Sequence, residues 1–272
     1  MKILRIFPTK TSCTPDDELA LSGKRCWPGL FHPIVDEVHI SVVFDWDIEK
    51  AQRIKAAWET YYAGRVFVGG PALGSPAEDF VPGKYLRKGI TITSRGCVRK
   101  CAFCFVHKRE GTIRTLKILP GNIIQDNNLL ACPNDHVKEV FAMLRHEKGV
   151  QFSGGLDMRL LQDWHIQEMR KLAIKMMWFA ADSKEAVQQA PFIAHRLQCW
   201  KRRKTRCYVL IGFASDTLRQ AEQRLIKIWE AGFLPFAQFY RGKNEQEKTK
   251  EWKKLIVQFS RPAATYASMG KK

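Results

Sequence analysis

Residues 89–111 have the sequence GITITSRGCVRKCAFCFVHKREG, in which a short β-like run leads directly into three cysteines. Cys97, Cys101 and Cys104 are spaced C-x3-C-x2-C, and the five other cysteines of the chain form no C-x2-C pair. A series of β/α repeats begins with this β-like run. The three thiols therefore lie where the chain enters its larger α/β region.

From residue 90 onward, apolar strand-like runs alternate with amphipathic helical segments. The strands are predicted at 90–96, 121–131, 150–161, 175–183, 206–215 and 233–240. Six β/α units are too few for the eight of a closed barrel, so we predict an α/β fold with a partial (β/α)6 TIM-type barrel over residues 85–262. Such barrels carry their chemistry at the carboxyl ends of the strands, and the cysteines follow the first strand.

The residues before the repeats form a separate, smaller α/β pattern. Strand-like segments at 37–44 and 65–74 flank a helical pattern at 47–63. A β/α/β unit of this kind crosses over right-handed, so residues 1–80 are predicted to form a small or abbreviated Rossmann-like domain. Residues 74–85, rich in Gly and Pro, are the predicted linker. Residues 263–272 are predicted to be a basic C-terminal tail.

The composition favours a cytoplasmic protein with an anionic partner. No apolar run of about 18 residues is present, and the opening MKILRIF is too short for a signal peptide, so no membrane partner is expected. Eight cysteines with one tight trio do not resemble a secreted disulfide framework. The 45 Lys and Arg against 27 Asp and Glu, a formal charge of +18, favour a polyanion such as nucleic acid. The alternative is a charged surface that serves solubility.

The three thiols are a donor set for a soft metal. Thiolates suit zinc or iron–sulfur clusters, and three of them leave one iron of a four-iron cluster open. An open coordination position is what a catalytic metal centre needs. The alternative is a closed structural zinc site, with His107 as the fourth ligand in C-x3-C-x2-C-x2-H.

The string SRGCVRKCAFC, residues 94–104, resembles the C-x3-C-x-aromatic-C loop of the radical S-adenosylmethionine (radical SAM) superfamily. The resemblance covers residues 85–262 and is greatest to uncharacterised members that carry ITSRGC and KREG. The region before it is similar to a shortened form of the Rossmann domain found in cobalamin-domain members.

The resemblance implies a [4Fe-4S] cluster held by Cys97, Cys101 and Cys104, with SAM on the fourth iron. One electron would cleave the sulfonium of SAM, and the 5'-deoxyadenosyl radical would take a hydrogen atom from an unidentified substrate. An electron donor such as flavodoxin or ferredoxin is the implied partner. Cobalamin is not expected, because the D-x-H-x-x-G signature is absent: DEVHIS, residues 36–41, has an extra residue and no glycine.

The same resemblance implies positions that would bind SAM. In the family the turn after the second strand, of Gly-Gly-Glu type, binds the SAM amino group, and the strands that follow contact the ribose, carboxylate and adenine. The corresponding residues here are Asp126, Asn127 and Asn128 after the second strand, Gly154 and Gly155 one strand later, Asp182 and Ser183 after the fourth, and Gly212 after the fifth. Which turn takes the amino group stays open. Each acid has an alternative interpretation as a helix N-terminal residue favoured by the helix dipole.

The basic residues fall into two groups. Lys108, Arg109, Arg241 and Lys243 follow predicted strands, whereas WKRRKTR, residues 200–206, precedes one and should lie on the opposite face.

The sequence leads to three hypotheses for the function of the chain. The chain is a radical SAM enzyme whose candidate substrate is nucleic acid or nucleotide-derived, a radical SAM enzyme acting on a peptide or small molecule, or a zinc-stabilised nucleic-acid-binding protein.

Overall fold

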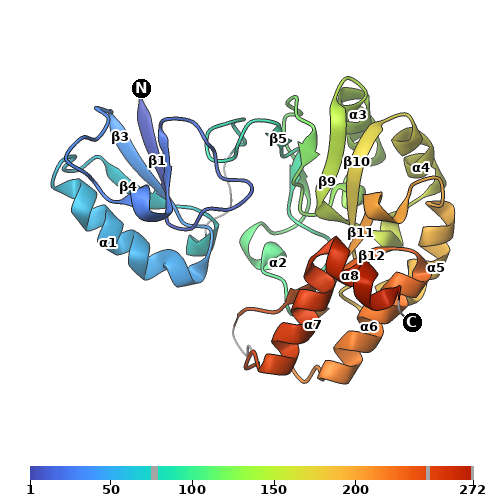
Figure 1. Ribbon diagram of the computed structural model, residues 1–272. Helices are drawn as coiled ribbons and strands as arrows, with labels where there is room; N and C mark the ends of the chain where they lie inside the picture. Colours follow the sequence, from blue (N-terminus) through green and yellow to red (C-terminus); the bar gives the residue numbers. More distant parts are fainter. Residues whose placement is uncertain (75–78, 243–245, 271–272) are drawn as a thin grey trace. The chain divides into compact units, whose positions relative to one another are not determined.

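A computed structural model describes residues 1–74, 79–242 and 246–270 (Figure 1). The chain folds as two compact units, each with its own hydrophobic core. The first comprises Met1–Ile90 with Lys108–Gly111, and the second comprises Thr91–His107 with the chain from Thr112 onward. No helix in the described residues has both the length and the apolar character needed to cross a membrane.

The first unit is built on a four-stranded parallel sheet with the order β2-β1-β3-β4. Its elements are β1 (Ile3–Phe7), β2 (Ala20–Ser22), η1 (Gly23–Cys26), β3 (Glu37–Ser41), η2 (Asp45–Asp47), α1 (Ile48–Glu59), β4 (Val66–Gly69) and η3 (Pro71–Leu73). Ile54 and Trp58 of α1 are fully buried with Leu4 of β1 and Val38 of β3 in one core. The predicted β/α/β unit is present as β3, α1 and β4. Strands β1 and β2 were not predicted.

The second unit contains a six-stranded sheet with the order β12-β11-β10-β9-β8-β5. Its strands are β5 (Ile90–Thr91), β8 (Ile123–Ile124), β9 (Lys148–Asp157), β10 (Ala173–Ala180), β11 (Thr205–Ile211) and β12 (Leu234–Phe239). The ladders from β8 to β12 are all parallel. Each of the six predicted ranges contains a strand of this sheet, and the α/β class is confirmed. The first two strands are much shorter than predicted, and residues 129–131 of the second range form a 3-10 helix. Within the described residues, neither sheet closes on itself.

The connections between these strands are mostly helical. They contain the β-ribbon β6 (Ser94–Arg95) with β7 (Arg114–Thr115), and α2 (Val106–Arg109), η4 (Leu129–Ala131), α3 (Asn134–Leu144), η5 (Met158–Leu160), α4 (Asp163–Arg170), α5 (Lys184–Arg196), η6 (Arg202–Lys204) and α6 (Leu218–Ala231). After β12 come α7 (Lys250–Ser260) and α8 (Pro262–Met269). Most of the predicted C-terminal tail is thus helix α8, and Lys271 and Lys272 lie outside the described residues.

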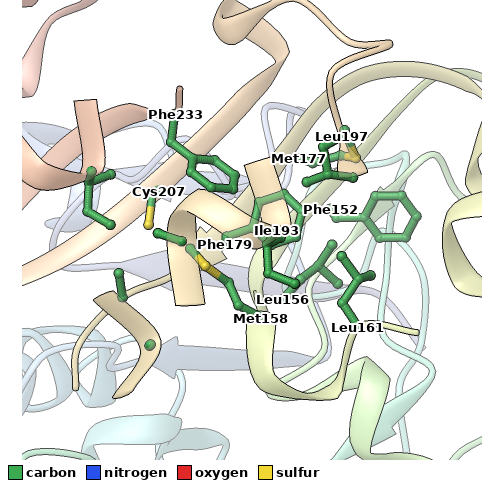
Figure 2. Close-up of a cluster of buried hydrophobic side chains, with 14 of the residues drawn as sticks. Phe152, Leu156, Met158, Leu161, Met177, Phe179, Ile193, Leu197, Cys207 and Phe233 are labelled. Carbon is green, nitrogen blue, oxygen red and sulfur yellow. The ribbon is translucent and has the colours of Figure 1, made fainter. Parts of the chain in front are cut away.

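The core of the second unit lies between the sheet and its helices. Phe152 of β9 and Phe179 of β10 are buried together with Ile193 of α5 and Phe233, which precedes β12 (Figure 2). Right-handed crossovers between strands in sequential order place every connecting helix on the same face of the sheet. Because β8 to β12 run parallel, their carboxyl ends meet at one edge of the sheet. The cysteine loop begins at that edge, since Thr93, just after β5, donates to Asp126, just after β8.

Candidate metal centre

The cysteine loop begins with a glycine turn. Gly96 has a φ of 86°, a left-handed conformation that glycine adopts without steric cost. Its N–H donates to Asn127 Oδ1 at 3.1 Å. Cys97, Cys101 and Cys104 follow, all half-buried, and the N–H of Cys104 donates to the Cys101 carbonyl at 3.0 Å. This hydrogen bond closes a turn from Cys101 to Cys104, and Cys97 lies earlier in the same loop.

The three thiols lie within electrostatic range of one another. Burial is the main cause that raises the pKa of Cys101, and the charges of Cys104 and Cys97 raise it further. The Arg159 guanidinium acts in the opposite direction. Thiolates repel one another in this way when no cation lies between them. A metal that binds them as thiolates removes this repulsion and releases their protons.

The chemistry of the donors fits an iron–sulfur cluster. Three thiolates are the ligand type that such clusters use, and each would bind a different iron. In the part of the chain that the structure describes, no three His, Cys, Asp or Glu side chains are grouped so that they could hold a metal ion. His107, the fourth ligand of the alternative zinc site, has a buried Nδ1 with no hydrogen-bond partner among the described residues. The fit thus rests on donor type and on the proximity of the thiols.

Asp157, the last residue of β9, anchors the cysteine loop. Arg99, which lies between Cys97 and Cys101, donates from Nε to Asp157 Oδ2 at 3.0 Å. Arg159 donates from Nε to Oδ1 at 2.7 Å and from Nη2 to Oδ2 at 3.0 Å. Burial alone would raise the pKa of Asp157, but the hydrogen bonds and charges of these guanidinium groups lower it. One carboxylate therefore joins the loop to the carboxyl edge of the sheet.

Arg159 is a site residue that the sequence did not single out. Its Nη1 also reaches Ser183 Oγ at 3.4 Å, so it connects the ends of β9 and β10. Its position two residues after a strand end was the available signal, since the reactive face of a β/α sheet is built from such positions.

Asp126, predicted to contact the SAM amino group, accepts hydrogen bonds from other residues of the chain. Its carboxylate accepts hydrogen bonds from the Thr93 N–H at 2.7 Å, the Thr93 hydroxyl at 2.6 Å and the Ser94 hydroxyl at 2.8 Å. The residue is only 2% exposed, and this burial is the main cause that raises its pKa. In this structure Asp126 ties the start of the cysteine loop to the end of β8.

The two asparagines that follow also contact the loop. Asn127 accepts from Gly96, as described above, and Asn128 Nδ2 lies 3.4 Å from Cys97 Sγ. The Oδ1 atom of Asn128 is buried and has no hydrogen-bond partner among the described residues. It is therefore an unused acceptor beside a predicted metal ligand.

The Gly154–Gly155 pair lies within β9 and not in a turn after it. A Cβ atom at position 154 would lie 1.9 Å from the Asp126 carbonyl oxygen, so the backbones of β9 and the residue after β8 approach each other closely. Gly155 has a φ of 91°. Backbone packing and conformation thus account for both glycines in this structure.

Asp182 and Ser183 follow β10 and differ in role. Asp182 accepts a hydrogen bond from the Leu210 N–H at 2.9 Å. Burial raises its pKa to about 6, against the opposing effects of the Leu210 hydrogen bond and of the Arg159 and Arg224 charges. Ser183 caps α5 and accepts from the Ala186 N–H at 3.3 Å. Ser183 is therefore the N-cap of α5, whereas the Asp182 carboxylate bonds to the neighbouring strand.

The turn after β11 begins at Gly212. This residue has a φ of 73°, and a Cβ atom there would lie 2.6 Å from the Phe239 ring. Its N–H donates to Asp216 Oδ2 at 2.9 Å, and Arg224 holds the same carboxylate at 2.6 and 2.9 Å. The turn is therefore rigidly built.

An aromatic contact brings this turn to the cysteine loop. The ring of Phe103, which precedes Cys104, lies edge-to-face against Phe213 with centroids 5.7 Å apart. Phe213 in turn packs edge-to-face on Tyr240 at 4.8 Å. The loop is thus flanked by the strand ends of β8, β9 and β11.

The basic residues predicted on the carboxyl face divide between the two units. Lys108 and Arg109 group with the first unit, where Arg109 donates to Glu110 Oε1 at 2.9 Å. Arg241 follows β12, and Lys243 lies outside the described residues.

The chain matches no model of a known protein family, and no curated protein matches it closely enough to count as a relative. The chemistry of the site therefore has to be argued from its own residues. The structure brings together predicted and unpredicted groups, namely the three thiols, Asn127, Asn128, Asp157, Arg159, Asp182 and Phe213.

Proposed function

We propose that the chain is a radical SAM enzyme whose [4Fe-4S] cluster is held by Cys97, Cys101 and Cys104. The observation that carries the proposal is that three thiols share one short loop at the carboxyl edge of a parallel sheet. The sequential strand order supports a partial barrel, because a doubly wound sheet reverses its order at a switch point. The small parallel sheet of the first unit agrees with a Rossmann-like domain.

When bound, the cluster and SAM supply the electron transfer and the radical that removes a hydrogen atom from the substrate. The chain's own residues hold and orient these groups. Arg99 and Asp157 keep the cysteine loop at the strand ends. Asn128 Oδ1, an acceptor without a partner in the described chain, suits a donor such as the SAM amino group.

We expect two further side chains to orient SAM. Asp182 lies close enough to Cys101 to raise its pKa and can accept from a ribose hydroxyl. Phe213, in contact with the cysteine loop through Phe103, offers an apolar ring beside which an adenine could stack. Both residues come from loops after strands, where a β/α sheet binds its ligands.

The substrate class is the less defined part of the proposal. A formal charge of +18 favours a phosphate polymer or a nucleotide derivative as substrate. A peptide or small molecule is the second candidate, in which case the charge serves solubility or a partner protein. One-electron reduction requires a donor protein of the flavodoxin or ferredoxin class, and that partner belongs to the proposal as well.

Metal analysis after anaerobic purification tests the proposal. We expect iron and sulfide in the parent protein and their loss in each of Cys97→Ala, Cys101→Ala and Cys104→Ala. Cys199→Ala is the matched control, because that cysteine is exposed and lies outside the loop. His107→Ala separates the two metals, since it should spare iron but would open a zinc site. Stoichiometric zinc without iron, lost on His107→Ala, would reject the proposal in favour of the zinc-stabilised protein.

The reductive chemistry has its own readout. With a strong reductant and SAM, the iron-loaded protein should release 5'-deoxyadenosine without added substrate, and Asp182→Ala should slow the release by weakening SAM binding. Chromatography of the quenched reaction measures both. A fully loaded protein that yields no 5'-deoxyadenosine would contradict the radical assignment.

A further inference from the structure

A pocket of about 340 Å³ lies at the amino ends of β11 and β12, the edge of the sheet opposite to the cysteine loop. Its walls come from the end of α5, the segment before β11 and the turn between α6 and β12. Among the residues that line it, Leu197 and Phe233 belong to the buried core shown in Figure 2, and Gln198 at the rim is exposed. The volume lies in the range of small-molecule sites, roughly 300–1,000 Å³.

Trp200 is the aromatic wall of this pocket. Its side chain is half-buried, and part of it packs against the hydrophobic core of the second unit. Within the described chain, the ring makes no contact with another aromatic ring, and the indole N–H makes no hydrogen bond. Trp200 therefore presents a half-buried aromatic side chain in the wall of the pocket.

The basic run that follows Trp200 is held against the same pocket. Arg202 donates from Nε to the carbonyl of Gly232, which lines the pocket, at 3.2 Å. Lys204 donates to the Ile174 carbonyl at 2.8 Å. Arg202 and Lys204 thus donate hydrogen bonds to backbone carbonyls. Lys201 and Arg203, which alternate with them in the sequence, are exposed. Two exposed positive charges therefore lie in the short segment between Trp200 and Thr205, both of which line the pocket.

We propose that this pocket binds a nucleobase with its attached phosphate, the base against Trp200 and the phosphates on Lys201 and Arg203. Stacking needs a base that is free of a duplex, so the source is a single strand or a free nucleotide. The phosphate contacts would contribute sequence-independent affinity. The site uses none of the cysteines, so it goes beyond the proposed radical chemistry and does not depend on it.

Fluorescence anisotropy with a labelled single-stranded 12-nucleotide RNA tests the site, with an abasic strand of equal length as the second probe. Trp200→Leu should weaken binding of the intact strand about tenfold and leave the abasic strand unaffected, because only the first can stack. The Lys201→Gln/Arg203→Gln double variant should weaken both strands and reduce the salt slope by about 1.4. The double variant Lys253→Gln/Lys254→Gln, on exposed positions of α7, is the charge-matched control.

Because Trp200 also packs on the core, its substitution can weaken binding by disturbing the fold. A second variant, at an exposed position, separates that effect from loss of the binding site. Gln198→Glu places a negative charge at the exposed rim and should weaken binding several-fold, whereas Gln188→Glu, exposed on the same helix region but outside the pocket, should not. Displacement of the RNA by adenosine monophosphate at similar affinity would identify a free nucleotide as the ligand. Failure of the mononucleotide to compete would identify a strand.

The inference is overturned if both Trp200→Leu and Gln198→Glu bind the intact strand as the parent does. It is also overturned if Trp200→Leu weakens the abasic strand equally, since the effect would then not come from stacking. Cys101→Ala should retain RNA binding. Loss of the metal centre and loss of this site would therefore appear as separate results.

Discussion

Arg99 and Asp157, 58 residues apart in sequence, form a 3.0 Å ion pair that fastens the cysteine loop to the end of β9. The Asp157 side chain is 7% exposed and that of Arg99 is 35% exposed. Asp157 also neutralises Arg159, so one carboxylate serves two guanidinium groups. Loss of one partner should therefore have a different effect from loss of the other. Without Asp157, the guanidinium groups of Arg99 and Arg159 would lie close together with no carboxylate to neutralise them. Without Arg99, the ion pair between Asp157 and Arg159 would remain.

Asp157→Asn should accordingly destabilise the protein more than Arg99→Gln does. We expect a loss of about 2 kcal/mol in the free energy of unfolding for Asp157→Asn and about 1 kcal/mol for Arg99→Gln, measured by urea denaturation. Asp135→Asn is the control, because its pair with Lys138 is exposed and should contribute little. Equal stability of Asp157→Asn and Asp135→Asn would show that the pair does not anchor the loop.

Gly154→Ala should be among the most damaging small substitutions in the second unit. The added Cβ would lie 1.9 Å from the Asp126 carbonyl oxygen, and backbone cannot yield as a flexible side chain can. We expect a loss of about 3 kcal/mol in unfolding free energy. Gly149→Ala, in the same strand, meets only Asn122 Nδ2 at 3.9 Å and has a φ of 67°, so it should cost about 1 kcal/mol from backbone strain. The reverse order in thermal melts would contradict the close strand approach.

Asp182 should make stability depend on pH. Its pKa is raised to about 6 by burial, so the folded state binds its proton more tightly than the unfolded chain, in which aspartate titrates near 3.9. Stability should fall as pH rises through the interval from about 4 to 6, by about 3 kcal/mol from this residue. Asp182→Asn still accepts from the Leu210 N–H but does not titrate. Its advantage over the parent should therefore grow with pH, and a constant difference across that interval would refute the prediction.

The eight thiols should differ in their reactivity towards an alkylating reagent. Burial raises the pKa of Cys26 and Cys132 to about 11 and holds that of Cys207 well above its usual range, so these three should react slowly near pH 8. Cys199 is exposed and should react first. Loading with iron and sulfide should protect the loop thiols and leave Cys199 reactive. Peptide mass spectrometry measures each site, and loop thiols that stay reactive after loading would argue against their role as ligands.

The local pattern of the sequence was enough to predict the strands of the second unit and the position of the thiols between them. Residues 207–211 of β11, CYVLI, form a continuous apolar run, and a run of this kind is visible in a single segment. Strands β1 and β2 escaped prediction, because ILRIF is a run of five residues with an arginine inside it and ALS has only three residues. Short runs carry too little periodicity to distinguish a strand from a loop.

Only the tertiary structure decided which side chains share the site. Asp126 looked like a ligand contact in the sequence, yet its oxygens accept from Thr93 and Ser94, more than thirty positions away. Neither Arg159 nor Asp157 was among the predicted site residues, but together they hold the cysteine loop. Hydrogen bonds and ion pairs between distant segments depend on how the strands align in the sheet, and that alignment is set by packing of the whole core. The spacing of Cys97, Cys101 and Cys104 is a local property of one loop, so the sequence alone determined the donor set, while folding determined its neighbours.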